Sequence, residues 1–231
     1  MLEIESIDVA YGRAQVLFGL SMTVPPGSLT CVMGRNGVGK TTLLKAIMGV
    51  LPVRKGRITF DGHDVTRLKT YDRVRLGLGY APQGHETFPQ LTVWENLRVV
   101  LEASPKATKS SLDEALDVFP ALRPFLRSKA GFLSGGQQQQ LSMARTLITR
   151  PSMLLLDEPT EGIQPSVILE IEDSIERLHK ETGVAVLLVE QYLDLALRLA
   201  DNFVIIDAGE VVRAGDRTDL QDPAVRQLLT V

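Results

Sequence analysis

Cysteine is almost absent from this chain, which has a single one, Cys31, among 231 residues. One cysteine excludes an internal disulfide and a cysteine-rich zinc site, and it favours a reducing compartment. Histidine is also scarce, and the three histidines, His63, His85 and His179, lack the spacing of metal ligands. The sequence therefore gives no sign of a chain held together by disulfides or by a structural metal.

The chain also lacks an excess of positive charge. It has 25 lysines and arginines against 28 aspartates and glutamates, a formal net charge of −3 at pH 7. Proteins that bind DNA or RNA usually have basic stripes, so we expect no nucleic-acid partner. With 44% hydrophobic and 23% charged residues, the composition is typical of a globular chain with one sizeable domain.

Long runs without charge are limited to one stretch, residues 14–34. Its length would span a membrane, but Pro25, Pro26 and Gly27 interrupt it, and we expect two strands joined by a turn. The N-terminus has neither the basic region nor the apolar segment of a signal peptide. If this protein acts at a membrane, another chain must bring it there.

Two kinds of pattern alternate along the chain. Short apolar or alternating runs predict strands at residues 2–9, 19–24, 29–33, 57–60, 153–156, 184–189 and 203–206. Helical spacing predicts helices at 41–48, 93–102, 111–119, 136–149, 166–182 and 193–199. Continuous apolar strands that alternate with helices indicate an α/β fold with a buried parallel sheet.

A glycine-rich loop lies between the strand predicted at 29–33 and the helix predicted at 41–48. It fits the phosphate-loop pattern, in which backbone N–H groups turn inward around phosphates and the helix directs its positive end at them. The lysine would add a charge at the terminal phosphates, and the first threonine hydroxyl could bind Mg²⁺. The predicted phosphate-binding residues are Gly34, Arg35, Asn36, Gly37, Val38, Gly39, Lys40, Thr41 and Thr42. A glycine turn without a ligand is the alternative, which the strand–loop–helix context disfavours.

Two carboxylates, Asp157 and Glu158, follow the apolar strand predicted at 153–156. Ligands of open α/β sheets bind at this end of the strands. We expect Asp157 to orient Mg²⁺ through water, and Glu158 to polarise the attacking water as general base. An acidic turn after a core strand is the alternative, which the phosphate loop disfavours.

Together with the run at 133–137, Leu-Ser-Gly-Gly-Gln, these motifs resemble those of ATP-binding cassette (ABC) ATPases, in the family's order and over nearly the whole chain. The resemblance implies ATP and Mg²⁺ as ligands and an ATPase activity. It also implies a RecA-like P-loop NTPase core with a parallel sheet, an N-terminal antiparallel β subdomain and an inserted helical subdomain at about 84–150, within a single domain 1–231.

The resemblance assigns roles to further residues. Tyr11 matches the aromatic residue that stacks on adenine, and Gln83 matches a glutamine that contacts Mg²⁺ and senses the partner subunit. The run at 133–137 matches the family's signature motif, and its residues Ser134, Gly135, Gly136 and Gln137 are called the signature here. They would reach the γ-phosphate that is bound by a second ATP-binding subunit, which would be a copy of this chain or a related one. Taken alone, this run could equally be a helix cap, with Ser134 as the N-cap residue.

Two positions depart from the commonest family pattern. Gln191 stands where most members have a switch histidine, and we expect it to act in catalysis as a neutral donor to the γ-phosphate or water. Gln164 stands where an aspartate is usual, and a weakened enzyme is the alternative interpretation. At both positions the sequence resembles the ATP-binding subunits of importers for branched-chain amino acids and for urea or short amides. The runs 32–40 and 137–140 most resemble the urea branch, so we expect urea import, with branched-chain amino acids as the alternative.

The resemblance further implies membrane permease subunits, which would be contacted by residues from Gln83 to about Arg127, and indirectly a periplasmic or extracellular solute-binding protein. The segment 85–89 and Trp94 belong to this region, although we expect Trp94 to be core. The protein would lie peripherally at the cytoplasmic face of the plasma (inner) membrane. A nucleic-acid machine would usually have coiled coils or zinc modules, and a small-molecule kinase would not need residues 133–137. An exporter shares the chemistry, but the Val-Glu-Gln run at 189–191 favours import.

Overall fold

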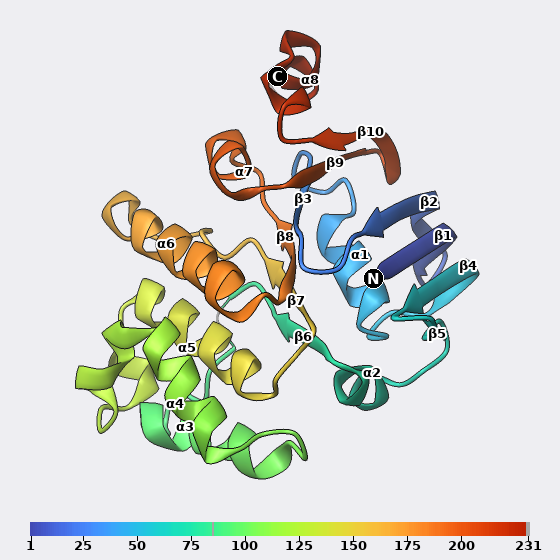
Figure 1. Ribbon diagram of the computed structural model, residues 1–231. Coiled ribbons are helices and arrows are strands. Elements are labelled where there is room, and N and C mark those ends of the chain that lie inside the picture. Colours follow the sequence, from blue (N-terminus) through green and yellow to red (C-terminus); the bar gives the residue numbers. More distant parts are fainter. Residues whose placement is uncertain (85, 230–231) are drawn as a thin grey trace. The chain divides into compact units, whose positions relative to one another are not determined.

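The computed structural model describes residues 1–84 and 86–229 of the chain (Figure 1). They divide into two compact units, one formed by Met1–Leu78 with Ala185–Val231 and the other by Gly79–Val184. We call them unit 1 and unit 2 and describe each by itself. In the described residues, no helix has both the length and the apolar character that a membrane crossing needs.

An antiparallel sheet forms the first part of unit 1. Its strand order is β2-β1-β4-β5, with β1 at Leu2–Tyr11, β2 at Ala14–Val24, β4 at Val53–Phe60 and β5 at His63–Asp64. Leu2 pairs with Val24 on one side and with Phe60 on the other. All three side chains are buried, so this sheet has an apolar face, as the alternating pattern predicts.

A second set of strands in unit 1 is mainly parallel. The order is β10-β9-β3-β8, with β3 at Leu29–Met33, β8 at Ala185–Val189, β9 at Asn202–Asp207 and β10 at Glu210–Asp216. Strand β3 pairs in parallel with both β8 and β9, while β10 runs antiparallel to β9. Every residue of β3 and β8 is buried, which explains their continuous apolar sequences. The uncharged stretch 14–34 is thus β2, a turn and β3, as predicted.

The helices of unit 1 are short. They are α1 at Lys40–Ile47, α2 at Thr70–Leu76, α7 at Leu193–Leu199 and α8 at Pro223–Leu229, with a 3₁₀ turn at Asp219–Gln221. Helix α1 directly follows the glycine-rich loop, and α7 contacts β3. The helices predicted at 41–48 and 193–199 are therefore confirmed, whereas α2 and α8 were not predicted.

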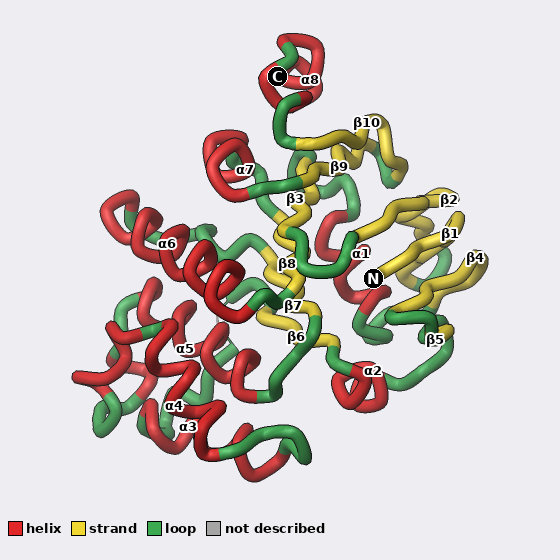
Figure 2. The backbone as a smooth tube through the Cα atoms, in the orientation of Figure 1, coloured by secondary structure: helices red, strands yellow, loops and turns green. Residues whose placement is uncertain are grey.

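Unit 2 is largely helical (Figure 2). Its helices are α3 at Val93–Ala103, α4 at Lys109–Val118, α5 at Gly135–Ile148 and α6 at Pro165–Thr182, with 3₁₀ turns at Pro120–Phe125 and Ala130–Phe132. Helix α5 packs against α3, α4 and α6. Two neighbouring strands complete the unit, β6 at Leu78–Ala81 and β7 at Met153–Asp157. The predicted helices are confirmed to within two residues at their ends.

The expectation that Trp94 belongs to the core is wrong, because its side chain is 41% exposed. Helix α3 buries Val93, Asn96 and Leu97, a stripe at helical spacing that leaves Trp94 on a different face. Phe88 is also exposed, at 43%. His85, at the start of the segment that we expect to contact a permease, lies outside the described residues.

Candidate nucleotide site

The predicted phosphate loop joins β3 to α1 in unit 1, the strand–loop–helix order that the sequence predicts. Two of its glycines are required by their surroundings. Gly34 has a φ of 148°, and a Cβ atom there would lie 2.2 Å from the backbone oxygen of Ile206. Gly39 has a φ of 112°, and its Cβ atom would lie 2.6 Å from the side chain of Leu17. Only glycine permits this tight loop, whose backbone N–H groups are available to anions.

Lys40 is the first residue of α1, and only 4% of it is exposed. Its ammonium group donates hydrogen bonds to the backbone oxygens of Gly34, at 2.9 Å, and Arg35, at 3.1 Å. The charge therefore lies inside the loop. Thr41 and the buried Thr42 follow in the first turn, where the helix dipole favours negative charge.

Gln191 lies at the same edge of unit 1 as the phosphate loop, because it follows β8 and β8 pairs in parallel with β3. Glu190, the residue before it, is 1% exposed, and its N–H group donates to Val32 at 3.1 Å. Its carboxylate accepts the N–H group of Gln191 at 2.8 Å and so shapes the turn that leads to Gln191. Sequence reasoning missed this role, although a charge after a continuous apolar strand could have indicated it. Tyr11 ends β1 and is 45% exposed.

The two predicted carboxylates lie in unit 2, at the end of β7. Asp157 is its last residue and is fully buried. Glu158 is 8% exposed and has a φ of 45°, which is uncommon for a residue with a Cβ atom. Tyr80, on the neighbouring strand β6, donates its hydroxyl hydrogen to Oδ2 of Asp157 at 3.0 Å. A buried carboxylate needs such donors to remain charged.

Gln83 lies two residues beyond the end of β6 and donates from its side-chain amide to the carboxylate of Glu161. Glu161 follows Glu158 by three residues, so the segment after β6 is linked to the segment after β7. Sequence reasoning missed Tyr80 and Glu161, because neither belongs to a recognised motif. Gln164 is the N-cap residue of α6, without a side-chain capping bond.

The signature run forms the start of α5. Ser134 is the N-cap residue, and its hydroxyl oxygen accepts the N–H group of Gln137 at 3.3 Å while the Gln137 side chain accepts the N–H group of Ser134 at 3.0 Å. This is a capping box, so the interpretation of Ser134 as a cap is confirmed. At Gly136, a Cβ atom would lie 2.3 Å from the side chain of Val167 on α6. Gly136 therefore allows the start of α5 to pack closely against α6.

The predicted residues fall into two groups. Unit 1 contains the phosphate loop, Gln191 and Tyr11, whereas unit 2 contains the carboxylates, Gln83 and the signature. The oxygen donors proposed for Mg²⁺ are the hydroxyl of Thr41, the amide of Gln83 and the carboxylate of Asp157. They fit this ion, because Mg²⁺ prefers hard oxygen ligands and Asp157 offers a buried negative charge.

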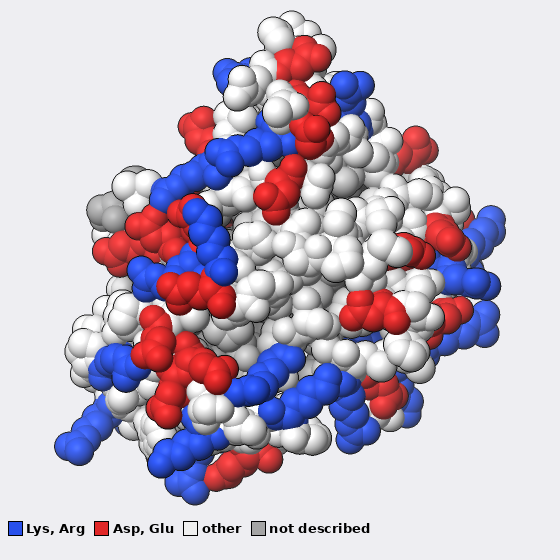
Figure 3. All heavy atoms as spheres, viewed as in Figure 1, with Lys and Arg blue, Asp and Glu red and all other residues white. Residues whose placement is uncertain are grey.

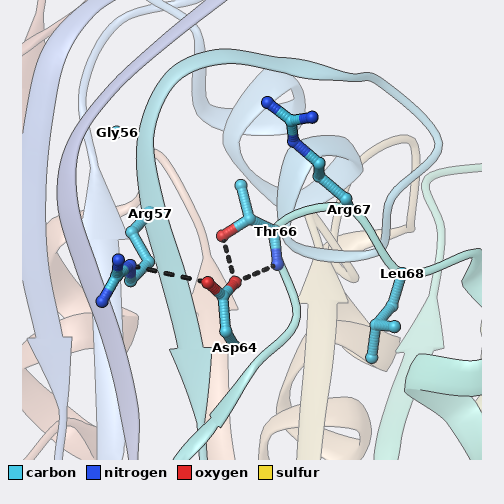
Figure 4. A pocket seen from close by; sticks show the side chains of 6 residues that line it. All are labelled: Gly56, Arg57, Asp64, Thr66, Arg67 and Leu68. Carbon is cyan, nitrogen blue, oxygen red and sulfur yellow. Dashed lines mark hydrogen bonds and ion pairs between the residues drawn. The ribbon is translucent and has the colours of Figure 1, made fainter.

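A separate hollow of about 320 Å³ lies in unit 1, outside the predicted site (Figure 4). Asp64 in this hollow accepts two hydrogen bonds from Thr66, at 2.6 and 2.9 Å, and lies 3.5 Å from Arg57. The Thr66 hydroxyl bond, more than any other contact, lowers the pKa of the Asp64 carboxyl. These bonds link Asp64 to Thr66 and Arg57, which is a structural role.

The fold and the phosphate loop define the class of the protein, a nucleotide-binding α/β protein with a helical insert. Comparison with known proteins gives the family: residues 17–161 match the family described as ABC transporter. The chain belongs to the ATP-binding subunits of ABC transporters and is an ATPase.

Similar proteins extend over nearly the whole chain. The probable branched-chain amino acid transport ATP-binding protein LivF of Archaeoglobus fulgidus is 38% identical over 95% of this chain and 94% of its own length. The high-affinity branched-chain amino acid transport ATP-binding protein BraG of Pseudomonas aeruginosa is 36% identical, over 92% and 91%. A more distant relative is the lipopolysaccharide export protein LptB of Escherichia coli K12, which is 31% identical over 98% and 95%.

A solved structure has the same fold. The crystal structure of a nucleotide-free ATP-binding cassette from an ABC transporter superimposes with a TM-score of 0.87 and is 27% identical, covering 100% of this chain and 99% of its own. The expected architecture, an α/β cassette with an antiparallel sheet, a parallel sheet and a helical insert, is confirmed.

Proposed function

We propose that this chain hydrolyses ATP to drive the import of branched-chain amino acids through a membrane permease. The observation that supports this best is the 38% identity to LivF over 95% of the chain. The sequence alone favours urea, but LivF and BraG, at 38% and 36% identity, are named for branched-chain amino acid transport. In this proposal residues 1–231 form one ATPase domain, whose helical subdomain at about 84–150 contains α3, α4 and α5.

Unit 1 would bind the nucleotide. Tyr11 would stack on adenine with its exposed ring, and the loop from Gly34 to Thr42 would surround the phosphates with N–H groups. Lys40 now donates to two loop carbonyls, and it would move its ammonium group from them to the terminal phosphates. Because the lysine is already held in the loop, little of its conformational entropy would be lost on binding.

Unit 2 would supply the general base and two of the Mg²⁺ ligands, and unit 1 would supply Thr41 and Gln191. When bound, Mg²⁺ neutralises charge on the phosphate oxygens. Thr41, Gln83 and Asp157 would hold it, with Asp157 acting through water. Glu158 would accept a proton from the attacking water as general base, and Gln191 would donate a neutral hydrogen bond to the γ-phosphate.

The start of α5 would complete the site of a second ATP-binding subunit. Ser134, Gly135, Gly136 and Gln137 would surround the γ-phosphate bound there. The N–H groups of Gly135 and Gly136 would be the backbone donors, because those of Ser134 and Gln137 are already bonded in the capping box. The second subunit would be a copy of this chain or a related one. Permease subunits would contact the segment around Phe88 and Trp94, both of which are exposed, and a solute-binding protein would act indirectly.

This function places the protein peripherally at the cytoplasmic face of the plasma (inner) membrane, where the permease would hold it. It needs no nucleic acid. Both acidic and basic side chains lie on the face drawn in Figure 3, and the formal net charge of the chain is −3.

Import of urea or a short amide is a second candidate function. The runs 32–40 and 137–140 resemble the urea branch more than the amino acid branch. Export of the LptB kind receives less support, because LptB is 31% identical to this chain and LivF is 38% identical.

The experiment that distinguishes these functions measures uptake in cells whose only copy carries Lys40→Ala. We expect uptake of labelled leucine to be lost and uptake of labelled urea to be unchanged. Lys45→Ala, which removes a lysine from the last turn of the same helix, is the matched control and should retain uptake. Loss of urea uptake alone would instead establish the second candidate, and normal uptake of both solutes would refute import.

A measurement on the purified protein tests the site itself. Lys40→Ala should bind ATP at least tenfold more weakly, because it loses the charge inside the loop. Glu158→Gln should retain ATP and accumulate as an ATP-bound dimer, whereas Glu181→Gln, at an exposed carboxylate of α6, should hydrolyse ATP normally. Rapid hydrolysis by Glu158→Gln would mean that another residue is the base.

A further inference from the structure

Tyr80 and Asp157 face each other from two neighbouring strands of unit 2. The Tyr80 hydroxyl donates to Oδ2 of Asp157 at 3.0 Å, and the two residues are 77 positions apart in the sequence. Asp157 is fully buried, and Tyr80 is half-buried. Sequence patterns give Tyr80 no part in the chemistry of the site.

The chemical nature of this donor matters for a carboxylate that is to attract a cation. A carboxylate rotates between broad, roughly two-fold orientations, and one strong hydrogen bond selects among them. A lysine or arginine would select an orientation too, but its positive charge would compete with the cation. A phenol is neutral, so it orients the carboxylate and leaves the full negative charge.

The backbone of Tyr80 is itself held in place by α5. The Thr146 hydroxyl lies 3.3 Å from the backbone oxygen of Tyr80 and 3.0 Å from that of Ser142, and it shares its single hydrogen between the two. At the preceding residue, Gly79, a Cβ atom would lie 2.7 Å from the Thr146 methyl group, so strand and helix are in close contact. The phenol therefore projects from a fixed backbone, which is what a positioning group requires.

A second bond links the same two segments. Gln83, three residues after Tyr80, donates its amide hydrogen to Glu161, four residues after Asp157. This bond uses the nitrogen of the Gln83 amide, so the amide oxygen remains as the possible metal ligand. Asp157 and Gln83, the two candidate metal ligands of unit 2, are thus each hydrogen-bonded to a residue of the other segment.

We propose that Tyr80 is a positioning residue for the divalent cation of the ATP site: its hydroxyl orients the Asp157 carboxylate without reducing its charge. The inference rests on the proposed function, in which Asp157 holds Mg²⁺. Partners that orient metal ligands typically change metal affinity 10–100-fold when they are removed. Because Asp157 would act through water, we expect the lower end of this range.

The test compares Tyr80→Phe with the parent protein in a Glu158→Gln background, which prevents turnover. With all ATP bound to protein, electron paramagnetic resonance measures the dissociation constant of Mn²⁺ as the probe ion. Tyr80→Phe should raise this constant about tenfold and leave the affinity for ATP in EDTA unchanged. Tyr71→Phe, which removes the hydroxyl of a half-exposed tyrosine on α2, is the matched control and should change neither.

A double-mutant cycle separates positioning from a general structural effect. In an Asp157→Asn background, Tyr80→Phe should cause no further loss of Mn²⁺ affinity, because the carboxylate that it orients is gone. Equal losses in both backgrounds, an Mn²⁺ constant within twofold of the parent, or an equal loss of metal-free ATP affinity would each overturn the inference. Failure of the parent protein to bind ATP would instead refute the proposed function.

Discussion

Arg73 holds the end of the helix that follows the phosphate loop. It lies on α2, and only 1% of it is exposed. One guanidinium nitrogen, Nη1, donates to the backbone oxygens of Ala46 at 2.8 Å and Ile47 at 2.6 Å, in the last turn of α1. The other nitrogens donate to Leu68 and Thr66, each at 3.0 Å. A single side chain thus caps α1 and fixes the segment before α2.

Replacing Arg73 by Met keeps much of the apolar stem and removes all four bonds. Each buried carbonyl that loses its donor costs about 1–3 kcal/mol. The Ile47 carbonyl is buried and loses its donor, which predicts a loss of about 1–3 kcal/mol, whereas the Ala46 carbonyl keeps the N–H group of Gly49 at 3.0 Å. The part-buried bonds to Leu68 and Thr66 add about 1 kcal/mol each. Part of this loss is offset, because burial lowers the pKa of Arg73 and so disfavours its charge, a cost that Met does not have. We expect a net destabilisation of about 3 kcal/mol.

Urea unfolding followed by circular dichroism measures this loss. With a slope of about 2.5 kcal/mol per molar urea, the midpoint of Arg73→Met should fall by about 1.2 M. Hydrogen exchange of the α1 amides should also become faster than in the parent, because the last turn of the helix loses its cap. Arg73→Lys should lie between the two, since an ammonium group cannot reproduce the planar fork of donors.

Arg75→Met is the control, two residues further along the same helix. The Arg75 side chain is 67% exposed, and its distance to Asp72 is 3.8 Å. Such surface pairs contribute about 0–1 kcal/mol, so its midpoint should move by less than about 0.4 M. If Arg73→Met shifted the midpoint no more than Arg75→Met, the capping argument would be refuted.

Three further predictions concern other parts of the molecule. Burial, more than the nearby Glu190, raises the pKa of the Cys31 thiol above its ordinary 9.0, so the thiol's stabilising contribution is complete below pH 9.0 and lost as the pH rises further. Between pH 8 and pH 10 the unfolding free energy should then fall by about 1.4 kcal/mol in total, and Cys31→Ala should lack this loss in urea titrations over the same range. Gly136→Ala should lower the unfolding midpoint by pushing on Val167, and Val167→Ala should restore it, whereas additive losses would contradict the contact. Gln191→His should retain ATPase activity within about tenfold, since either side chain can donate to a phosphate; complete loss would show that the amide itself is required.

The parts of the fold that could be predicted are those with a local signal. Strand β3 and helix α1 flank a loop whose glycines are required at their positions. The strand–loop–helix structure of residues 29–48 can therefore be predicted from the sequence. Strand β10 could not be predicted, because its residues are mostly exposed and it forms only by pairing with β9. Helix α2 has no apolar stripe, since its buried residue is Arg73, which a sequence pattern assigns to the surface.

The residues of the candidate site likewise divide into those that could be predicted from the sequence and those that could not. Asp157 and Gln191 are predictable, because polar residues that follow continuous apolar strands lie at the carboxyl edge of a parallel sheet. The residues that orient them, Glu190 for Gln191 and Tyr80 for Asp157, could not be predicted in this way. Glu190 is adjacent in sequence but is recognised only by its burial and its bond to the Gln191 N–H group. Tyr80 meets Asp157 across 77 residues, through a pairing of strands that no local pattern encodes.

This difference has a physical cause. A ligand is placed by the end of its own strand, a property of a few consecutive residues, whereas its orientation depends on a donor from another segment. The donor also needs no particular residue type, because a phenol, a hydroxyl or an amide can each supply a hydrogen bond. Motifs therefore identify the residues that would touch ATP and Mg²⁺, and only the fold identifies Tyr80 and Glu161, which hold two of those residues in place.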